Sequence, residues 1–101
     1  MTFVITGGSS GVGEAVVRRL QDHEVWLLDV NAPKDLADNH HFLSLDLANP
    51  DAIDRVVTSL PPSIAGLANV AGIAAAPEPE TVLCVNFLGL RHISEALAPR
   101  L

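Results

Sequence analysis

The chain has 101 residues and a formal net charge of −6, with twelve acidic residues against six Lys and Arg. This length suits one domain, and a hydrophobic content of 49% is enough for a packed core. Surfaces that bind nucleic acids or anionic membranes need clustered Lys and Arg, so the charge balance disfavours both. Cys84 is the only cysteine, and no secretory signal or membrane span is predicted, so we expect a soluble cytoplasmic protein.

The first half of the chain alternates between strand-like and helix-like patterns. Residues 2–6 are apolar, rich in β-branched side chains and bounded by glycine, which is typical of a strand buried on both faces. A helix is predicted from Gly11, because apolar residues recur there at helical spacing. Its expected buried face consists of Val12, Ala15, Val16 and Leu20. Two further strands are predicted over residues 24–30 and 41–47.

The second half continues this alternation. Asn49 is predicted to cap a helix whose first residue is Pro50, and a proline pair ends that helix. A fourth strand is predicted over residues 64–72, and a longer helix over residues 81–97 has Gly89 as a weak point. One face of the longer helix is expected to carry Leu83, Phe87, Leu90, Ser94 and Leu97. Strands that alternate with helices predict a single α/β domain with a doubly wound parallel sheet.

The glycine-rich stretch "GGSSGVG" at residues 7–13 is compatible with three kinds of site. A P-loop requires lysine at the position of Glu14, and a carboxylate there would repel phosphates. We therefore reject a P-loop. Residues 7–11 also satisfy the G-x-S-x-G pattern of a nucleophilic serine between a strand and a helix. That reading is disfavoured, because it leaves Gly13 and Asp29 without a role.

A dinucleotide site explains more of the pattern, although the glycines depart from the G-x-G-x-x-G spacing. Such a site needs a sharp turn, a backbone that can approach a pyrophosphate closely, and the N–H groups of a helix start. The loop residues that can meet these needs are Gly7, Gly11 and Gly13, with hydroxyl groups from Ser9 and Ser10. Asp29 ends the second strand about 20 residues later, where a carboxylate that binds ribose is expected. The competing interpretation is an ordinary strand-to-helix turn with a solvated Asp29.

The chain resembles the short-chain dehydrogenase/reductase family in four segments that occur in the family's order. "TGGSSGVG" at residues 6–13 fits the family pattern T-G-x-x-x-G-x-G, and "LDL" at residues 45–47 resembles the segment whose Asp holds the adenine ring. "NVAG" at residues 69–72 resembles the family's N-N-A-G, and "VNFLG" at residues 85–89 resembles the segment with its active-site Asn. Weaker local similarity points to the hydroxysteroid or coniferyl-alcohol dehydrogenase branch.

The resemblance implies a Rossmann fold with strand order 3-2-1-4 and a nicotinamide cofactor. The implied cofactor-binding residues are Gly7, Ser9, Ser10, Gly11, Val12, Gly13, Asp29, Asp46, Leu47, Val70, Ala71 and Gly72. Asp29 would accept hydrogen bonds from the adenosine ribose and would repel a 2′-phosphate, so NAD is expected rather than NADP. Asn86 matches the catalytic-site Asn, which in the family helps to hold a water-linked proton relay.

The sequence departs from the family pattern at two points. Val70 replaces the second Asn of N-N-A-G, which removes that side chain as a hydrogen-bonding group. The chain also contains no tyrosine, and its only lysine is Lys34, so the family's catalytic pair Y-x-x-x-K is missing. We therefore expect the cofactor-binding half of an oxidoreductase for alcohols or carbonyl compounds, incomplete at its C-terminus and inactive alone. The alternative is a non-catalytic module that binds a dinucleotide or self-associates.

Two further expectations concern self-association and metal binding. With strand order 3-2-1-4 the fourth strand is an apolar open edge, so a homo-oligomer is predicted. No metal site is predicted, because the neighbours His40 and His41 would point to opposite faces of a strand.

Overall fold

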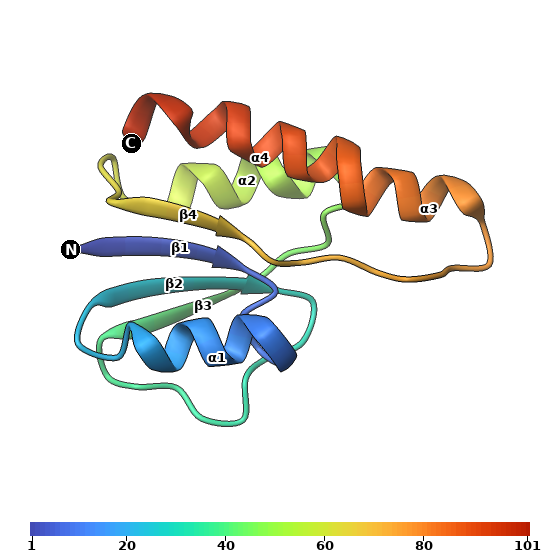
Figure 1. The fold of residues 1–101 in the computed structure, drawn as a ribbon. Coiled ribbons are helices and arrows are strands. Elements are labelled where there is room, and N and C mark those ends of the chain that lie inside the picture. The colour runs from blue at the N-terminus through green and yellow to red at the C-terminus, as the bar shows by residue number, and fades with distance from the viewer.

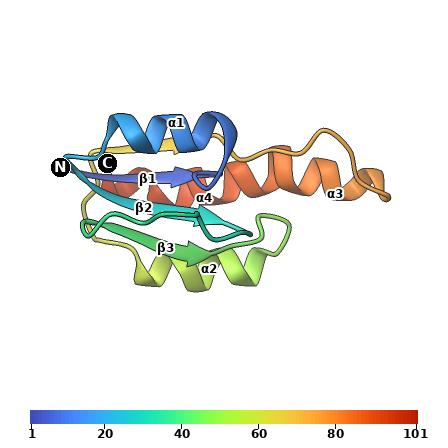
Figure 2. The same ribbon diagram turned by 90° about the horizontal axis from the view of Figure 1, so that it is seen from below.

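The computed structural model describes all of residues 1–101 and contains one four-stranded parallel sheet (Figures 1 and 2). The strand order is β3-β2-β1-β4, which confirms the predicted topology. The elements, in chain order, are β1 (Thr2–Thr6), α1 (Gly11–Arg19), β2 (Glu24–Asp29), β3 (His40–Ser44), α2 (Pro50–Ser59), β4 (Gly66–Asn69), α3 (Pro79–Leu83), η1 (Cys84–Gly89), α4 (Leu90–Leu97) and η2 (Ala98–Arg100). None of the helices combines the length and apolar character that crossing a bilayer requires.

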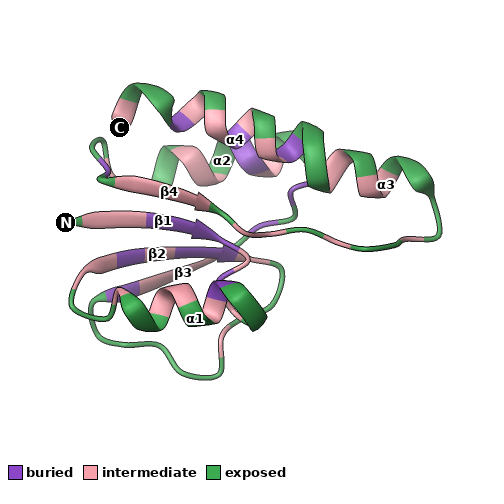
Figure 3. Cartoon of the chain, in the orientation of Figure 1, coloured by how far each residue is buried: buried purple, intermediate pink, exposed green.

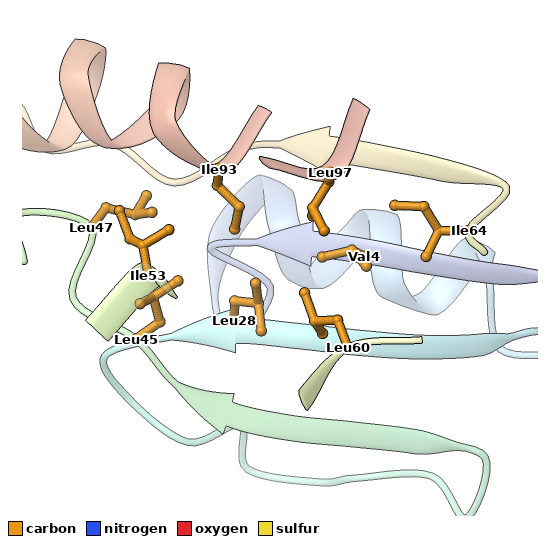
Figure 4. Packing of buried hydrophobic residues seen from close by; sticks show 9 residues of the cluster. All are labelled: Val4, Leu28, Leu45, Leu47, Ile53, Leu60, Ile64, Ile93 and Leu97. Atoms are coloured by element: carbon orange, nitrogen blue, oxygen red, sulfur yellow. The ribbon is translucent and has the colours of Figure 1, made fainter. Parts of the chain in front are cut away.

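The main core lies between the sheet and the helices α2 and α4. Alternate residues of a strand point to opposite faces, so Val4 and Leu28 meet Ile53 of α2 and Ile93 of α4 on this side (Figure 4). On the other face a smaller cluster centred on Leu27 packs under α1. Burial is accordingly concentrated in β1 and β2, the two central strands (Figure 3).

The start of α2 confirms the prediction for its N-cap. Asn49 caps the helix with a side-chain oxygen that accepts a hydrogen bond from the Ala52 N–H at 3.1 Å, and Pro50 is the first helical residue. The helix ends at Ser59, before the proline pair.

β2 ends one residue earlier than predicted, at Asp29, and local hydrogen bonds account for the earlier ends of β3 and β4. β3 ends at Ser44, because the Asp46 carboxylate accepts from the Ala48 N–H at 2.9 Å and turns the chain out of the ladder. β4 covers only Gly66–Asn69. Two residues after it, the Ala71 N–H donates to the Thr6 hydroxyl oxygen at 3.2 Å instead of to a strand carbonyl.

The predicted buried face of α1 is partly wrong. Val12 is 72% exposed and Ala15 is also exposed, whereas Val16 and Leu20 do pack against the sheet together with Val17. The cause is the buried Gly13, which lies against the glycine loop and turns Val12 outward.

The predicted long helix forms, but it contains a π-helical segment that the sequence pattern did not reveal. α3, η1 and α4 follow one another without a break, and η1 has π-helical hydrogen bonding. A π turn inserts an extra residue, so the apolar face before it is rotated relative to the face after it. Leu97 is buried as predicted, but Leu83 and Phe87 are 53% and 51% exposed. α3 extends past the carboxyl ends of the strands and has no buried residue (Figures 1 and 3).

Gly89 is a close contact point rather than a weak point in this helix. A Cβ atom at this position would lie 2.3 Å from the backbone oxygen of Leu47. In an open helix, Gly→Ala stabilises by about 0.5–1 kcal/mol. Here we expect Gly89→Ala to lower the free energy of unfolding by about 1–3 kcal/mol, because the helix must move away from the chain after β3. Urea unfolding measures this change, and a midpoint at or above that of the parent protein would contradict it.

Candidate functional site

The largest cavity lies at the carboxyl edge of the sheet and has a volume of about 490 Å³. Ligand sites of open α/β sheets form at this edge, and cavities of this size are typical of small-molecule sites. The segments that follow all four strands contribute to its wall, as do α3 and η1. The lining residues are Gly7, Ser10, Val12, Gly13, Leu28, Asp29, Val30, Leu45, Asp46, Leu47, Val70, Ala71, Gly72, Ile73, Thr81 and Val85.

The glycine loop is closely packed, and two of its glycines are required by geometry. Gly7 has a φ of +74°, and a Cβ atom on it would lie 2.8 Å from the Cα atom of Ala71. A Cβ atom on Gly13 would lie 1.8 Å from the backbone oxygen of Gly7. Side chains at either position would therefore force the loop open. Gly11 also has a positive φ, of +55°, but it faces open space.

The start of α1 offers free N–H groups to the cavity. The first backbone hydrogen bond within this turn is donated by Glu14 to the Ser10 carbonyl, and the Ser10 side chain does not cap the helix. The N–H groups before Glu14 therefore have no helical partner, and the helix dipole adds partial positive charge there. A phosphate or another anion is stabilised in such a position.

The carboxylate of Asp29 is held in place from two sides. Its Oδ2 atom accepts a hydrogen bond from the Ser9 N–H at 3.2 Å, and its Oδ1 atom accepts from the Asn31 N–H, also at 3.2 Å. These bonds fix the acidic group between the glycine loop and the chain that follows β2. Two acceptor oxygens at a cavity wall suit a ligand that donates hydroxyl groups.

The segment after β4 packs against the glycine loop and forms part of the cavity wall. Thr6 is 1% exposed, and its hydroxyl accepts from the Ala71 N–H. Thr6 thus positions the backbone of residues 70–72, a role that was not assigned from the sequence. The sequence feature that could have indicated this role is the position of Thr6 directly before the glycine-rich stretch.

Asn86 joins η1 to the same segment. Its Oδ1 atom accepts from the Ile73 N–H at 2.9 Å, and its Nδ2 atom donates to the Ile73 carbonyl at 2.7 Å. Asn86 itself does not line the cavity, whereas its neighbour Val85 does. The Asn86 amide therefore connects η1 to the segment that follows β4. Its catalytic role remains a prediction.

The structure brings most of the predicted cofactor-binding residues together. Ten of the twelve line the cavity, and the two that do not are Ser9 and Gly11. Ser9 still acts through its N–H on Asp29, while its Oγ atom is buried without a hydrogen-bond partner. The lining residues that were not predicted are Leu28, Val30, Leu45, Ile73, Thr81 and Val85. Most of these are apolar residues that are next to predicted positions in the sequence. Thr81 and Val85 belong to α3 and η1, and they line the cavity because they lie on the side of the helix that faces it.

The arrangement fits a nucleotide that carries a diphosphate and free ribose hydroxyls. The free N–H groups at the start of α1 can bind the diphosphate, and Asp29 can bind the hydroxyls. Leu47 and Val70 are among the apolar residues of the wall, and apolar surface suits a flat aromatic base. No Lys or Arg lines the cavity, so any negative charge must be held by backbone N–H groups.

Comparison with known proteins agrees with this geometry. The model of the NAD dependent epimerase/dehydratase family matches residues 3–100. A coniferyl-alcohol dehydrogenase from Pseudomonas sp. strain HR199 is 36% identical over 98% of this chain and 39% of its own length. The NADP-dependent 3-hydroxy acid dehydrogenase YdfG from Escherichia coli K12 is 31% identical over 98% of this chain and 48% of its own length.

A solved structure supports the same assignment. A short chain dehydrogenase family protein from Francisella tularensis superposes with a TM-score of 0.88 and 27% identity, over 98% of this chain and 46% of the other. The chain thus spans less than half the length of these relatives. It belongs to the NAD-dependent epimerase/dehydratase family, within the short-chain dehydrogenases.

Proposed function

We propose that this chain forms the NAD-binding part of a short-chain oxidoreductase that acts on an alcohol or a carbonyl compound. The observation that carries the proposal is the Asp29 carboxylate, held by two backbone N–H groups at the wall of the main cavity. When bound, the cofactor would supply the hydride acceptor or donor. The residues of this chain bind and orient it.

In this proposal each wall of the cavity binds one part of the cofactor. The N–H groups at the start of α1 bind the pyrophosphate, and Asp29 accepts hydrogen bonds from the adenosine ribose. Asp46 and Leu47 flank the adenine. The backbone of residues 70–72, which Thr6 positions, lines the other side.

Electrostatics favours NAD over NADP at this site. The 2′-phosphate of NADP would meet the Asp29 carboxylate, and like charges repel strongly when water is partly excluded. No Lys or Arg of the cavity wall is available to offset this repulsion. The curated relative YdfG carries NADP dependence in its name, but the carboxylate at position 29 argues for a different preference in this chain.

The proposed chemistry needs groups that these 101 residues do not contain. The chain has no tyrosine, and Lys34 lies outside the lining of the main cavity. General acid–base help contributes about 10²- to 10⁴-fold to such reactions. We therefore expect this chain to bind the cofactor without measurable turnover of alcohols.

Calorimetry of the chain with NADH and NADPH tests the proposal. We expect saturable NADH binding and NADPH binding at least about tenfold weaker, which corresponds to about 1.4 kcal/mol. An absence of NADH binding would overturn the dinucleotide role, and tighter NADPH binding would overturn the preference. NADH binding without turnover is also the outcome expected of a non-catalytic dinucleotide module, the alternative function. The two are distinguished by supplying the catalytic half of a relative as a fusion, which restores turnover only for the oxidoreductase.

We also propose that two copies of the chain associate. β4 pairs with β1 on one side only, and Leu83, Phe87 and Leu88 are about half exposed on the helix that extends past the sheet. Light scattering is expected to show a dimer that shifts towards monomer in Phe87→Ser. Ala15→Ser, on the opposite side of the sheet, is the control and should leave the dimer intact. A monomer at all concentrations would contradict the proposal.

A further inference from the structure

Gly89 lies where the helix formed by η1 and α4 meets the segment that follows β3. It is buried, and a Cβ atom at this position would overlap the backbone oxygen of Leu47 and lie 2.8 Å from the Leu47 Cβ atom. A packed interior has no room for contacts this short. The missing side chain of glycine therefore allows the helix to lie directly against this segment.

The helix has little freedom to relieve a side chain at position 89. The added Cβ would also lie 2.9 Å from the carbonyl oxygen of Cys84, at the other end of the π-helical segment. One turn after Gly89, the fully buried Ile93 holds α4 in the main core, to which Leu47 also belongs (Figure 4). A larger residue at position 89 must therefore displace either the helix or the segment that contains Leu47.

The segment in contact with Gly89 forms one wall of the main cavity. Leu45, Asp46 and Leu47 line this cavity, whereas Gly89 does not. The Leu45 N–H donates a hydrogen bond to the Asp29 carbonyl at 3.0 Å. This wall is therefore joined to the end of β2, which carries the carboxylate held at the cavity.

Hydrogen bonds within the segment fix its shape. The Asp46 carboxylate accepts from the Ala48 N–H at 2.9 Å, and the Asp46 carbonyl accepts from the Asn49 N–H at 3.0 Å. Both bonds join residues of the same turn, so they do not determine how far the turn lies from the helix. That distance depends on the contact between Gly89 and Leu47. A change at Gly89 therefore reaches the cavity through Leu47.

We propose that Gly89 is a positioning residue for the adenine part of the cofactor. This inference rests on the proposed function, in which Asp46 and Leu47 flank the adenine. Gly89 does not touch the ligand, and it acts by letting the helix hold Leu47 at its place in the wall. A side chain at position 89 would displace the residues beside the base, while the N–H groups at the start of α1 would stay in place on the other side of the sheet.

The test compares two ligands that differ by the base alone. AMP contains adenine, ribose and phosphate, whereas ribose 5-phosphate lacks the adenine. NMR titration of the ¹⁵N-labelled chain measures both affinities in the parent chain and in Gly89→Ala. We expect Gly89→Ala to bind AMP about tenfold more weakly, because overpacking displaces the wall beside the base. Its affinity for ribose 5-phosphate should equal that of the parent chain. Unchanged AMP affinity, or an equal loss for both ligands, would overturn the proposal.

Ile93→Val is the matched control for a general loss of stability. It removes one buried methylene group from the same helix, at a residue that does not line the main cavity. We expect it to lower the midpoint of urea unfolding, as Gly89→Ala does, but to leave the AMP affinity unchanged. If Ile93→Val weakens AMP binding as much as Gly89→Ala, the positioning role of Gly89 is refuted.

The parent chain provides a measurement that holds even if Gly89→Ala fails to fold. Saturation with AMP should shift the amide signal of Gly89 through its contact with Leu47, although Gly89 lies outside the lining of the cavity. Ribose 5-phosphate should leave this signal in place. An unshifted Gly89 amide in the AMP complex would contradict the inference.

The failure of this inference can be distinguished from the failure of the proposed function. A parent chain that binds neither NADH nor AMP would refute the proposed function, and the inference with it. A parent chain that binds both, with an AMP affinity that Gly89→Ala leaves intact, would refute this inference alone.

Discussion

Gly13→Ala is expected to abolish detectable NADH binding and to lower the free energy of unfolding. The added Cβ would lie 1.8 Å from the backbone oxygen of Gly7, so the loop must open or the first turn of α1 must move away. Either movement displaces the N–H groups that bind the pyrophosphate. Overpacking of this kind costs about 1–3 kcal/mol of stability. Calorimetry with NADH and urea unfolding measure the two effects.

The control for this variant is Gly11→Asn. Gly11 has a positive φ, but an added Cβ would have no atom within 4 Å, and Asn adopts this backbone conformation more readily than most other residues with side chains. The free energy of unfolding of Gly11→Asn should stay close to that of the parent chain. If Gly13→Ala binds NADH with unchanged affinity, the proposed packing of the loop is wrong.

Asp29→Asn is expected to weaken NADH binding by about tenfold or more and to narrow the gap between NADH and NADPH. The charged acceptor for the ribose hydroxyls is lost, and hydrogen bonds to charged groups contribute about 1.5–3 kcal/mol. The repulsion of a 2′-phosphate is lost as well, so NADPH should bind no more weakly than before. Calorimetry with both cofactors measures this change in preference.

The matched control for Asp29→Asn is Asp38→Asn, which removes the same charge from a residue that does not line the main cavity. Asp38→Asn should leave the affinities for NADH and NADPH unchanged. In that case the effect of Asp29→Asn is local and does not come from the change in net charge. A preference between the cofactors that Asp29→Asn leaves intact would show that the carboxylate does not determine it.

Local signals in the sequence were sufficient to predict the alternation of strands and helices and part of the site, whereas the strand order 3-2-1-4 was implied by the family resemblance. The alternation of strands and helices along the chain predicts the parallel sheet. Asn49-Pro50 predicts the start of α2, because a helix cap depends on neighbouring residues alone. Asp29 could be predicted at the cavity because it ends a strand next to the glycine loop. Residues 45–47 and 69–72 were placed by family resemblance.

The structure differs from the sequence predictions where tertiary contacts override a regular hydrophobic pattern. The exposure of Phe87 follows from the π turn of η1, and hydropathy gives no sign of an inserted residue. Val12 faces solvent because Gly13 must pack against Gly7. The amide of Asn86 is bound to Ile73, a contact between segments that no single-sequence pattern encodes.

The most direct test of the central claim is an NMR titration of the ¹⁵N-labelled chain with NADH. We predict saturable amide shifts at the start of α1, at Asp29 and along residues 70–72, with no shift at Asp38, which does not line the main cavity. An absence of saturable shifts, or shifts confined to residues outside the main cavity, would contradict the claim that this cavity is a dinucleotide site.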